Sequence, residues 1–188
     1  KVIVINPAKE PGLVKFAVPK SPKSMLSGGT EIASHYLQPK IGSDIAALKA
    51  IGKHLLETNA NAIANEYIEQ HTSGFEAYKQ DLIDTSWQSL EQATGLSQAE
   101  LTDVAKTYAK SNNVVFAWGM GITHHVHGVE NVEAIANLAL LRGMIGKRFA
   151  GLLPLRGHSN VQGIGTIGVK PVLAKDVLSA IENHFKVT

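Results

Sequence analysis

The sequence predicts an α/β domain with a Rossmann-like, three-layer fold around a mostly parallel sheet. Two apolar runs rich in β-branched residues, at 2–6 and 113–118, are typical of buried parallel strands. Helical segments follow, and an alternation of strand, loop and helix indicates a parallel sheet. A length of 188 residues, 44% of them hydrophobic, suits one domain with a buried core.

The helices are located by their caps and their apolar spacing. Ser43 or Asp44 is expected to cap a helix over residues 42–57. Ser97 and Glu100 stand three residues apart at the start of a second helix, which is the spacing of a capping box. Further helices are expected in short pieces over 65–94, over 129–142 with a stop at Gly143, and over about 173–185.

Two stretches are expected to lack regular structure. Residues 18–29 are rich in Pro, Ser, Lys and Gly, so we expect an exposed, mobile loop. Residues 145–169 are Gly-rich and expected to be irregular. Because no repeat or linker divides the chain, residues 1–188 are expected to form one domain. The chain starts without Met and inside an apolar run, so we expect a fragment of a longer protein.

Composition excludes several classes of function. A net charge of +2 with scattered lysines gives no reason to expect a nucleic-acid partner. The absence of cysteine excludes disulfides, cysteine-ligated metal sites and a cysteine nucleophile from this chain. No apolar run approaches the roughly 18 residues of a membrane span, so no membrane partner is expected. No signal peptide is recognisable, and we expect a cytoplasmic protein.

Two loops that follow predicted strands are suited to a nucleotide. The first is "PAKEPG" after Asn6, and the second is "GMGITHH" after Trp118. Ligands of open α/β sheets bind beyond the carboxyl ends of the strands, where glycines let the backbone approach a phosphate. The second loop lacks the third glycine of a dinucleotide fingerprint. On pattern alone, a tight turn without a ligand is favoured there.

Three histidines, His124, His125 and His127, suggest a metal site at first sight. His124 and His127 would share one face of a helix, and zinc accepts imidazole ligands. However, no second group of ligands stands at a recognisable spacing, and Glu130 is the nearest carboxylate. The pattern therefore favours histidines that hold no metal.

Two further polar segments allow alternative interpretations. Asp44 in "GSD" is either part of a helix cap or a carboxylate that accepts N–H groups from a guanine edge. The loop over 155–163 is either a solvated surface loop or a binding loop in which Arg156 holds a carboxylate. The apolar flank "GLLPL" favours the second interpretation, because it pulls the loop toward the interior.

Four segments together resemble one enzyme family. They are "VIVINPAKEPG", "YLQPKIGSDIAALKAIGK", "WGMGITHHVHGVENVEAIANLALLRGMIGKRFAG" and "PLRGHSNVQG". In order and spacing they resemble the molybdopterin-guanine-dinucleotide oxidoreductases of the dimethyl-sulfoxide-reductase superfamily, and the formate-dehydrogenase-like alpha subunits most. The resemblance implies one internal domain of a longer enzyme. Its cofactor would be molybdenum bis(molybdopterin guanine dinucleotide), of which this domain binds one dinucleotide.

The resemblance also implies roles for individual residues in cofactor binding. Asn6 and Pro7 match positions that line the guanosine ribose and diphosphate. The segment that matches the guanine-recognising positions consists of Gly42, Ser43 and Asp44, with Asp44 as the base-reading carboxylate. The segment that matches the pterin-diphosphate contacts consists of Gly119, Met120, Gly121 and His124.

Two residues are implied in catalysis. Arg156 matches the arginine that formate dehydrogenases place beside molybdenum to hold the substrate carboxylate. His158 stands where those enzymes usually carry Gln, as does His124. A histidine next to the metal would bring its own titration and could assist proton transfer.

The resemblance implies part of an enzyme that oxidises or reduces a small substrate, formate being the first candidate. Its partners would be the remaining domains of the same enzyme and an electron-transfer partner. The molybdenum ligand and any iron–sulfur cluster would lie outside this chain, because the chain has no cysteine. The isolated domain is expected to be inactive. The alternatives are a non-catalytic nucleotide-binding module and an assembly domain.

Overall fold

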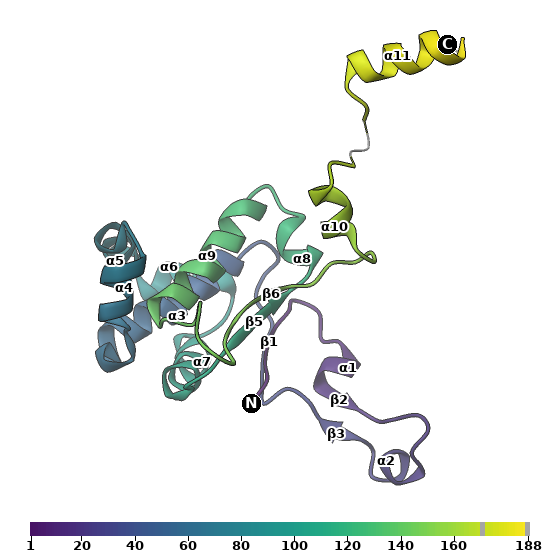
Figure 1. Cartoon of the computed structure of the whole chain (residues 1–188). Helices are drawn as coiled ribbons and strands as arrows, with labels where there is room; N and C mark the ends of the chain where they lie inside the picture. Colours follow the sequence, from purple (N-terminus) through teal and green to yellow (C-terminus); the bar gives the residue numbers. More distant parts are fainter. Residues whose placement is uncertain (170–171, 187–188) are drawn as a thin grey trace.

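A helical body forms the largest part of the molecule. The computed structural model describes residues 1–169 and 172–186. In the body, α3 (Asp44–Thr58) lies at the centre, because Leu48, Ile51 and Leu55 are buried along it. The helices packed against α3 are α5 (Phe75–Asp84), α6 (Trp87–Thr94), α7 (Gln98–Lys110) and α9 (Gly128–Leu141), and η1 (Ala60–Ala62) and α4 (Asn65–His71) complete the body (Figure 1).

The strands form short pairs. β1 (Ile3–Ile5) runs parallel to β4 (His35–Leu37), and β5 (Val115–Trp118) runs parallel to β6 (Gly151–Pro154). The third pair, β2 (Lys15–Phe16) with β3 (Thr30–Glu31), is antiparallel. The predicted α/β class is confirmed. However, Val115 is 53% exposed, so β5 is less buried than its apolar sequence predicts.

The predicted helix starts differ in their outcome. The capping box is confirmed, because the Ser97 Oγ accepts from the Glu100 N–H at 3.3 Å and the Glu100 Oε2 accepts from the Ser97 N–H at 2.9 Å. The predicted cap of α3 is wrong in its bonding. Ser43 is the N-cap residue, but its φ of −103° and ψ of 17° leave the extended region that a capping side chain needs. Its Oγ donates to the Lys40 carbonyl at 2.6 Å instead.

The two stretches predicted to be irregular both contain regular elements. Within 18–29 lies α2 (Pro22–Leu26), which begins with Pro22 and is capped by the Ser21 hydroxyl. Within 145–169 lie β6 and α10 (Val161–Thr166). The remaining elements are α1 (Pro11–Val14), α8 (Met120–Thr123) and α11 (Lys175–Phe185). Among the described helices none is both long and apolar enough to cross a bilayer.

Arg142 joins three elements of the helical body. It follows α9 and donates from Nε to the Ala62 carbonyl at 3.1 Å. Its terminal nitrogens donate to carbonyls at the end of α7, to Ala109 at 3.0 Å and Ser111 at 2.9 Å, and also to Tyr108. The guanidinium also lies 4.8 Å from the centre of the Tyr108 ring. Because the last carbonyls of a helix lack intrahelical donors, Arg142 acts as the C-terminal cap of α7.

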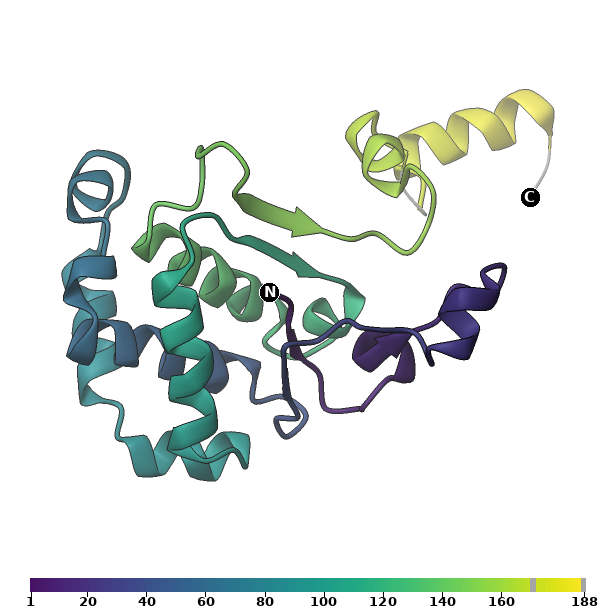
Figure 2. The same ribbon diagram turned by 90° about the horizontal axis from the view of Figure 1, so that it is seen from below.

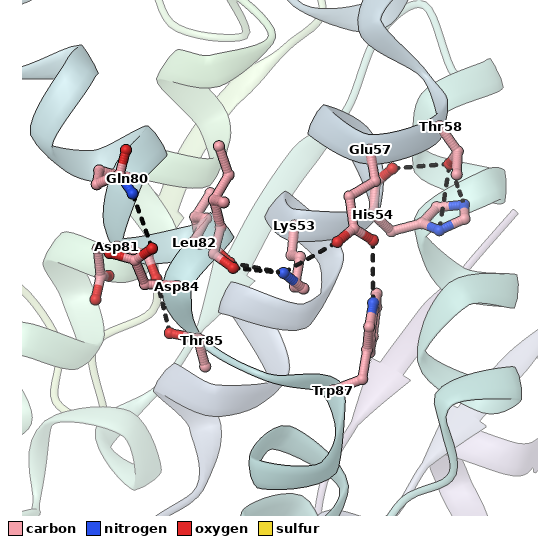
Figure 3. A network of polar contacts seen from close by, with 11 residues as sticks. Lys53, His54, Glu57, Thr58, Gln80, Asp81, Leu82, Asp84, Thr85 and Trp87 are labelled. Carbon is pink, nitrogen blue, oxygen red and sulfur yellow. Dashed lines mark hydrogen bonds and ion pairs between the residues drawn. The ribbon is translucent and has the colours of Figure 1, made fainter.

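Lys53 joins α3 to the end of α5 (Figure 3). Its buried ammonium donates to the carbonyls of Leu82 at 3.2 Å and Ile83 at 2.9 Å. It also pairs with Glu57 at 3.0 Å, and Glu57 accepts from the Trp87 indole at 3.0 Å. Burial raises the pKa of Glu57, but hydrogen bonds from Lys53 and Trp87 outweigh burial and hold that pKa below its usual value.

His54 lies beside this network and is also buried. Its Nε2 lies 3.1 Å from the Thr58 Oγ1, as Figure 3 shows. Burial lowers the pKa of His54, and the positive charge of Lys106 lowers it further. The helical body therefore favours the neutral form of this imidazole.

Candidate functional site

The first group of predicted binding residues lies where β1 and β4 end. The Asn6 N–H donates to the Leu37 carbonyl at 3.0 Å, which extends the parallel ladder by one bond. The Asn6 side chain accepts from the Ala8 N–H at 3.0 Å and donates to Glu10 at 2.7 Å. The Pro7 carbonyl accepts from the Gln38 side chain at 3.1 Å. Asn6 therefore shapes its own loop, and the Pro7 carbonyl is held against the loop that follows β4.

Gly42, Ser43 and Asp44 lie where the second of these loops enters α3. Gly42 is exposed and has a φ of +81°, a conformation that glycine adopts without strain. No atom lies within 4 Å of the point where a side chain would start on Gly42. The Ser43 side chain does not accept a hydrogen bond from the first N–H groups of α3. A ligand can approach the backbone here.

A pocket of about 430 Å³ adjoins this segment. The amino end of α3 and one side of α6 form its walls, with Thr85 and Ser89 as polar side chains on the α6 side. Lys40 donates from Nζ to the Gln92 carbonyl at 2.9 Å, so its ammonium is already held by α6. The lining residues are Lys40, Ile41, Gly42, Ser43, Ile45, Ala46, Lys49, Thr85, Ser89, Leu90 and Ala93. Asp44 is not among them.

The second group lies where β5 and β6 end. Trp118 and Pro154 are partners at the last position of the parallel ladder. One more bond follows, from the Leu155 N–H to the Trp118 carbonyl at 2.7 Å. Gly119 and Arg156 thus follow two strands that end side by side. The predicted cofactor segment and the predicted catalytic loop start from the same edge of this strand pair.

The two loops of the second group lie close together. The Met120 sulfur lies 3.6 Å from the point where a side chain would start on Gly157. Arg156 and His158, on either side of Gly157, are exposed, as are Gly119, Gly121 and His124. Apart from chain neighbours and the local helix backbone, no atom of the described residues lies within 4 Å of the side-chain position on Gly119 or Gly121. The backbone of this group is as open to a ligand as that of Gly42.

The three histidines behind Gly121 do not form a metal centre with other described residues. His127 lies 3.7 Å from the Glu130 carboxylate, one turn along the chain. The backbone N–H of His124 donates to the Met120 carbonyl at 2.9 Å and closes α8. Within residues 1–169 and 172–186, no three His, Asp or Glu side chains gather at metal-binding geometry.

Some positioning residues were not predicted from the sequence. Asn131 is buried in α9 and donates from Nδ2 to the Ile122 carbonyl at 2.9 Å, which ties α8 to α9. Gly128 packs against the Thr123 backbone so closely that no side chain fits. Thr85, which follows α5, and Ser89 of α6 line the pocket. A buried Asn in an apolar helix is a signal that could have identified Asn131, whereas the pocket residues give no local signal.

The open backbone at Gly42, Gly119 and Gly121 fits a dinucleotide, because phosphates and sugars bind where glycine lets the main chain approach. The pocket beside Gly42 is also within the size range of small-molecule sites. Both strand pairs carry side chains that pack against one core, including Ile5, Phe116 and Trp118. The residues present at each strand end therefore leave the main chain accessible to a phosphate or sugar group of a ligand.

The chain is similar to several known proteins. The chain is 39% identical to protein YdeP of Escherichia coli strain K12 over 197 residues, which cover 100% of this chain and 26% of YdeP. It is 38% identical over 140 residues to formate dehydrogenase H of the same organism, covering 74% of this chain and 19% of that protein. Acetylene hydratase from Pelobacter acetylenicus shares the fold, with a TM-score of 0.61 and 17% sequence identity. The aligned region covers 79% of this chain and 18% of the hydratase chain.

The chain spans about a quarter of the length of the YdeP proteins that it matches. A family model described as molybdopterin oxidoreductase matches residues 1–187. That match covers both groups of strand-end residues and all helices of the body. The chain therefore belongs to the molybdopterin oxidoreductase family.

Proposed function

We propose that this chain is the part of a formate-dehydrogenase-like, molybdenum-dependent oxidoreductase that binds the guanine dinucleotide of one molybdopterin. One observation carries the proposal. The residues that the family resemblance assigns to the cofactor lie at the carboxyl ends of two parallel strand pairs, where the backbone of Gly42, Gly119 and Gly121 is open. Ligands of α/β proteins bind at such strand ends.

Each group of residues has a distinct task in this proposal. Asp44, at the first position of α3, accepts N–H groups of the guanine base, since a carboxylate is an acceptor only. The loop of Asn6 and Pro7 lies against the ribose and diphosphate. Gly119, Met120, Gly121 and His124 contact the pterin side of the diphosphate.

The loop that follows β6 faces the substrate in this proposal. Arg156 holds a substrate carboxylate by a bidentate ion pair, a geometry that a guanidinium provides and an ammonium does not. His158, two residues further, takes up or releases the proton that accompanies the reaction. When bound, the molybdenum–pterin group supplies two-electron oxidation or reduction of a small substrate, of which formate is the first candidate.

The cofactor role can be tested on the full-length protein by measuring molybdenum and pterin per protein. We expect both in the wild type and a loss of most of both in Asp44→Ala. Asp84→Ala is the matched control, because Asp84 is an exposed helical carboxylate whose side chain accepts from Gln80 and lies outside both strand-end groups. A wild-type protein without molybdenum or pterin contradicts the proposal and favours a non-catalytic nucleotide-binding or assembly domain. Equal cofactor content in both variants contradicts the role of Asp44.

The catalytic role is tested separately with formate and an artificial electron acceptor. We expect Arg156→Ala to lose at least about 100-fold in kcat/KM with its molybdenum content unchanged, since a charge-assisted bidentate pair contributes about 3 kcal/mol. Arg148→Ala, which removes another exposed arginine, should keep full activity. His158→Gln should alter the pH dependence of turnover. Activity that survives in Arg156→Ala rules out its substrate role, and a wild type inert toward formate rules out that substrate.

A further inference from the structure

Lys40 attaches the loop before α3 to the end of α6. Its main-chain N–H donates to the Thr94 carbonyl at 2.8 Å, and its ammonium donates to the Gln92 carbonyl at 2.9 Å. α3 and α6 lie together in the helical body, as Figures 1 and 2 show. Because these two bonds reach two different points on the last turn of α6, they prevent the loop from rotating about either bond alone.

The end of α6 is suited to receive this lysine. The last carbonyls of a helix lack intrahelical donors and carry a partial negative charge, so an ammonium is favoured there. Gly95 ends α6 with a φ of +72°. The Lys40 stem lies over Gly95, with its Cε 3.1 Å from the point where a side chain would start. Gly95 therefore leaves the space through which the Lys40 side chain reaches the Gln92 carbonyl.

Lys40 also closes the turn that leads into α3. Its carbonyl accepts from the Ser43 N–H at 3.1 Å and from the Ser43 hydroxyl at 2.6 Å. A bond from residue i+3 back to residue i closes a β-turn, and the positive φ of Gly42 falls at the third residue, where glycine is favoured. Asp44 comes next and is the first residue of α3. The direction in which Asp44 leaves the turn is thus set by the residue that is bonded to α6.

We propose that Lys40 is a positioning residue for guanine selectivity, because it holds the turn from which Asp44 recognises the base. In the function proposed above, on which this inference rests, Asp44 accepts N–H groups of guanine. A carboxylate accepts such bonds only within a narrow range of distance and angle. Adenine presents a ring acceptor where guanine presents a ring N–H, so adenine gains nothing from a well-placed Asp44. Loss of the Lys40 ammonium therefore weakens guanine binding selectively.

The affinities of GDP and ADP for the cofactor-free full-length protein measure this selectivity. We expect the wild type to prefer GDP, and Lys40→Met to lower the ratio of the two affinities about three- to tenfold, since one hydrogen bond that holds the turn is lost. Methionine keeps an apolar stem over Gly95 and the main-chain bond to Thr94, so ADP binding should not change. Lys40→Arg, which keeps a cationic donor, should restore most of the selectivity.

Lys147→Met is the matched control, because the exposed Lys147 also donates to a main-chain carbonyl, that of Asn112, in the loop before β6. This variant should keep the wild-type ratio. The role of Lys40 would be overturned by a wild-type ratio in Lys40→Met, by equal losses of GDP and ADP affinity, by an equal fall in Lys147→Met, or by a ratio in Lys40→Arg as low as in Lys40→Met. A wild type that does not distinguish GDP from ADP would overturn the guanine recognition by Asp44, and the role of Lys40 with it. The two failures are distinguishable, because only the second removes the selectivity of the wild type.

Discussion

Replacement of Arg142 by Met should destabilise the helical body strongly, although Arg142 lies in neither strand-end group. The methionine stem fills similar space but cannot donate. The carbonyls of Ala62, Ala109 and Ser111 then lose the bond from Arg142, and the Tyr108 carbonyl keeps only its bond from the Ser111 N–H among the described residues. Because these carbonyls belong to α7 and η1, the loss affects the contact of both with α9.

The magnitude follows from the number of bonds and their burial. A hydrogen bond from a charged donor contributes about 1.5–3 kcal/mol when buried, and Arg142 is only partly buried, so about 1 kcal/mol for each of four bonds is appropriate. The total is about 3–5 kcal/mol, a large part of the roughly 5–15 kcal/mol that stabilises a domain. For a chain of this size, that loss lowers Tm by roughly 6–20 °C.

The assay is urea and thermal unfolding followed by circular dichroism, with Arg148→Met as the matched control. Arg148 is exposed and stacks on its neighbour Phe149, so its loss should cost less than about 0.5 kcal/mol. Arg142→Lys should fall between the two, because one ammonium cannot reach all four carbonyls. If Arg142→Met is as stable as Arg148→Met, Arg142 is not the cap of α7.

Three further predictions concern the helical body and α8. Thermal stability should fall as the pH is lowered from 7.5 to 5.5. In the unfolded state His54 takes up a proton near pH 6.5, whereas in the folded state its lowered pKa delays protonation to lower pH, so acid favours the unfolded state. An equal fall in stability of the His54→Gln variant would contradict this prediction. Lys53→Met should lower the free energy of unfolding in urea by about 2 kcal/mol, because two α5 carbonyls lose their donor. An unchanged urea midpoint would contradict this role of Lys53. Gly128→Ala should lower both the Tm and the molybdenum content of the full-length protein, because the methyl group of the new alanine clashes with the Thr123 carbonyl. Gly12→Ala is the control and should change neither, because the space around Gly12 is open.

The elements that could be predicted from the sequence are those with local signals. The capping box of Ser97 and Glu100 fixes the start of α7 by bonds between residues three apart, so the sequence alone reveals it. β1 was predicted from a β-branched run. Its partner β4 was missed, because His35–Leu37 is short, mixed in polarity and held by a ladder to residues 32 positions earlier. β6 is also short and is held by a ladder to residues 36 positions earlier, and Gly151 and Pro154 at its ends do not indicate a strand.

The candidate site shows the same division. Positions at strand ends could be foreseen, because parallel strands present their carboxyl ends at one edge. The hydrogen-bond partner of the Ser43 hydroxyl could not be foreseen, because it depends on backbone angles that the residue type does not fix. The pocket walls contributed by Thr85 and Ser89 depend on how the end of α5 and α6 pack beside α3, which is a tertiary property. The roles given to Asp44 and Arg156 come from family resemblance and stay predictions.

The exposed position of the strand-end residues has an evolutionary consequence. Arg156, His158, Gly121 and His124 are exposed in this chain, whereas the buried core lies chiefly in the helices. Substitutions in these loops therefore cost little folding free energy, so the stability of the scaffold does not restrict their drift. Under the proposed function, a lineage with this domain would acquire a new substrate preference by a few loop substitutions, and selection on stability would leave little trace of the change.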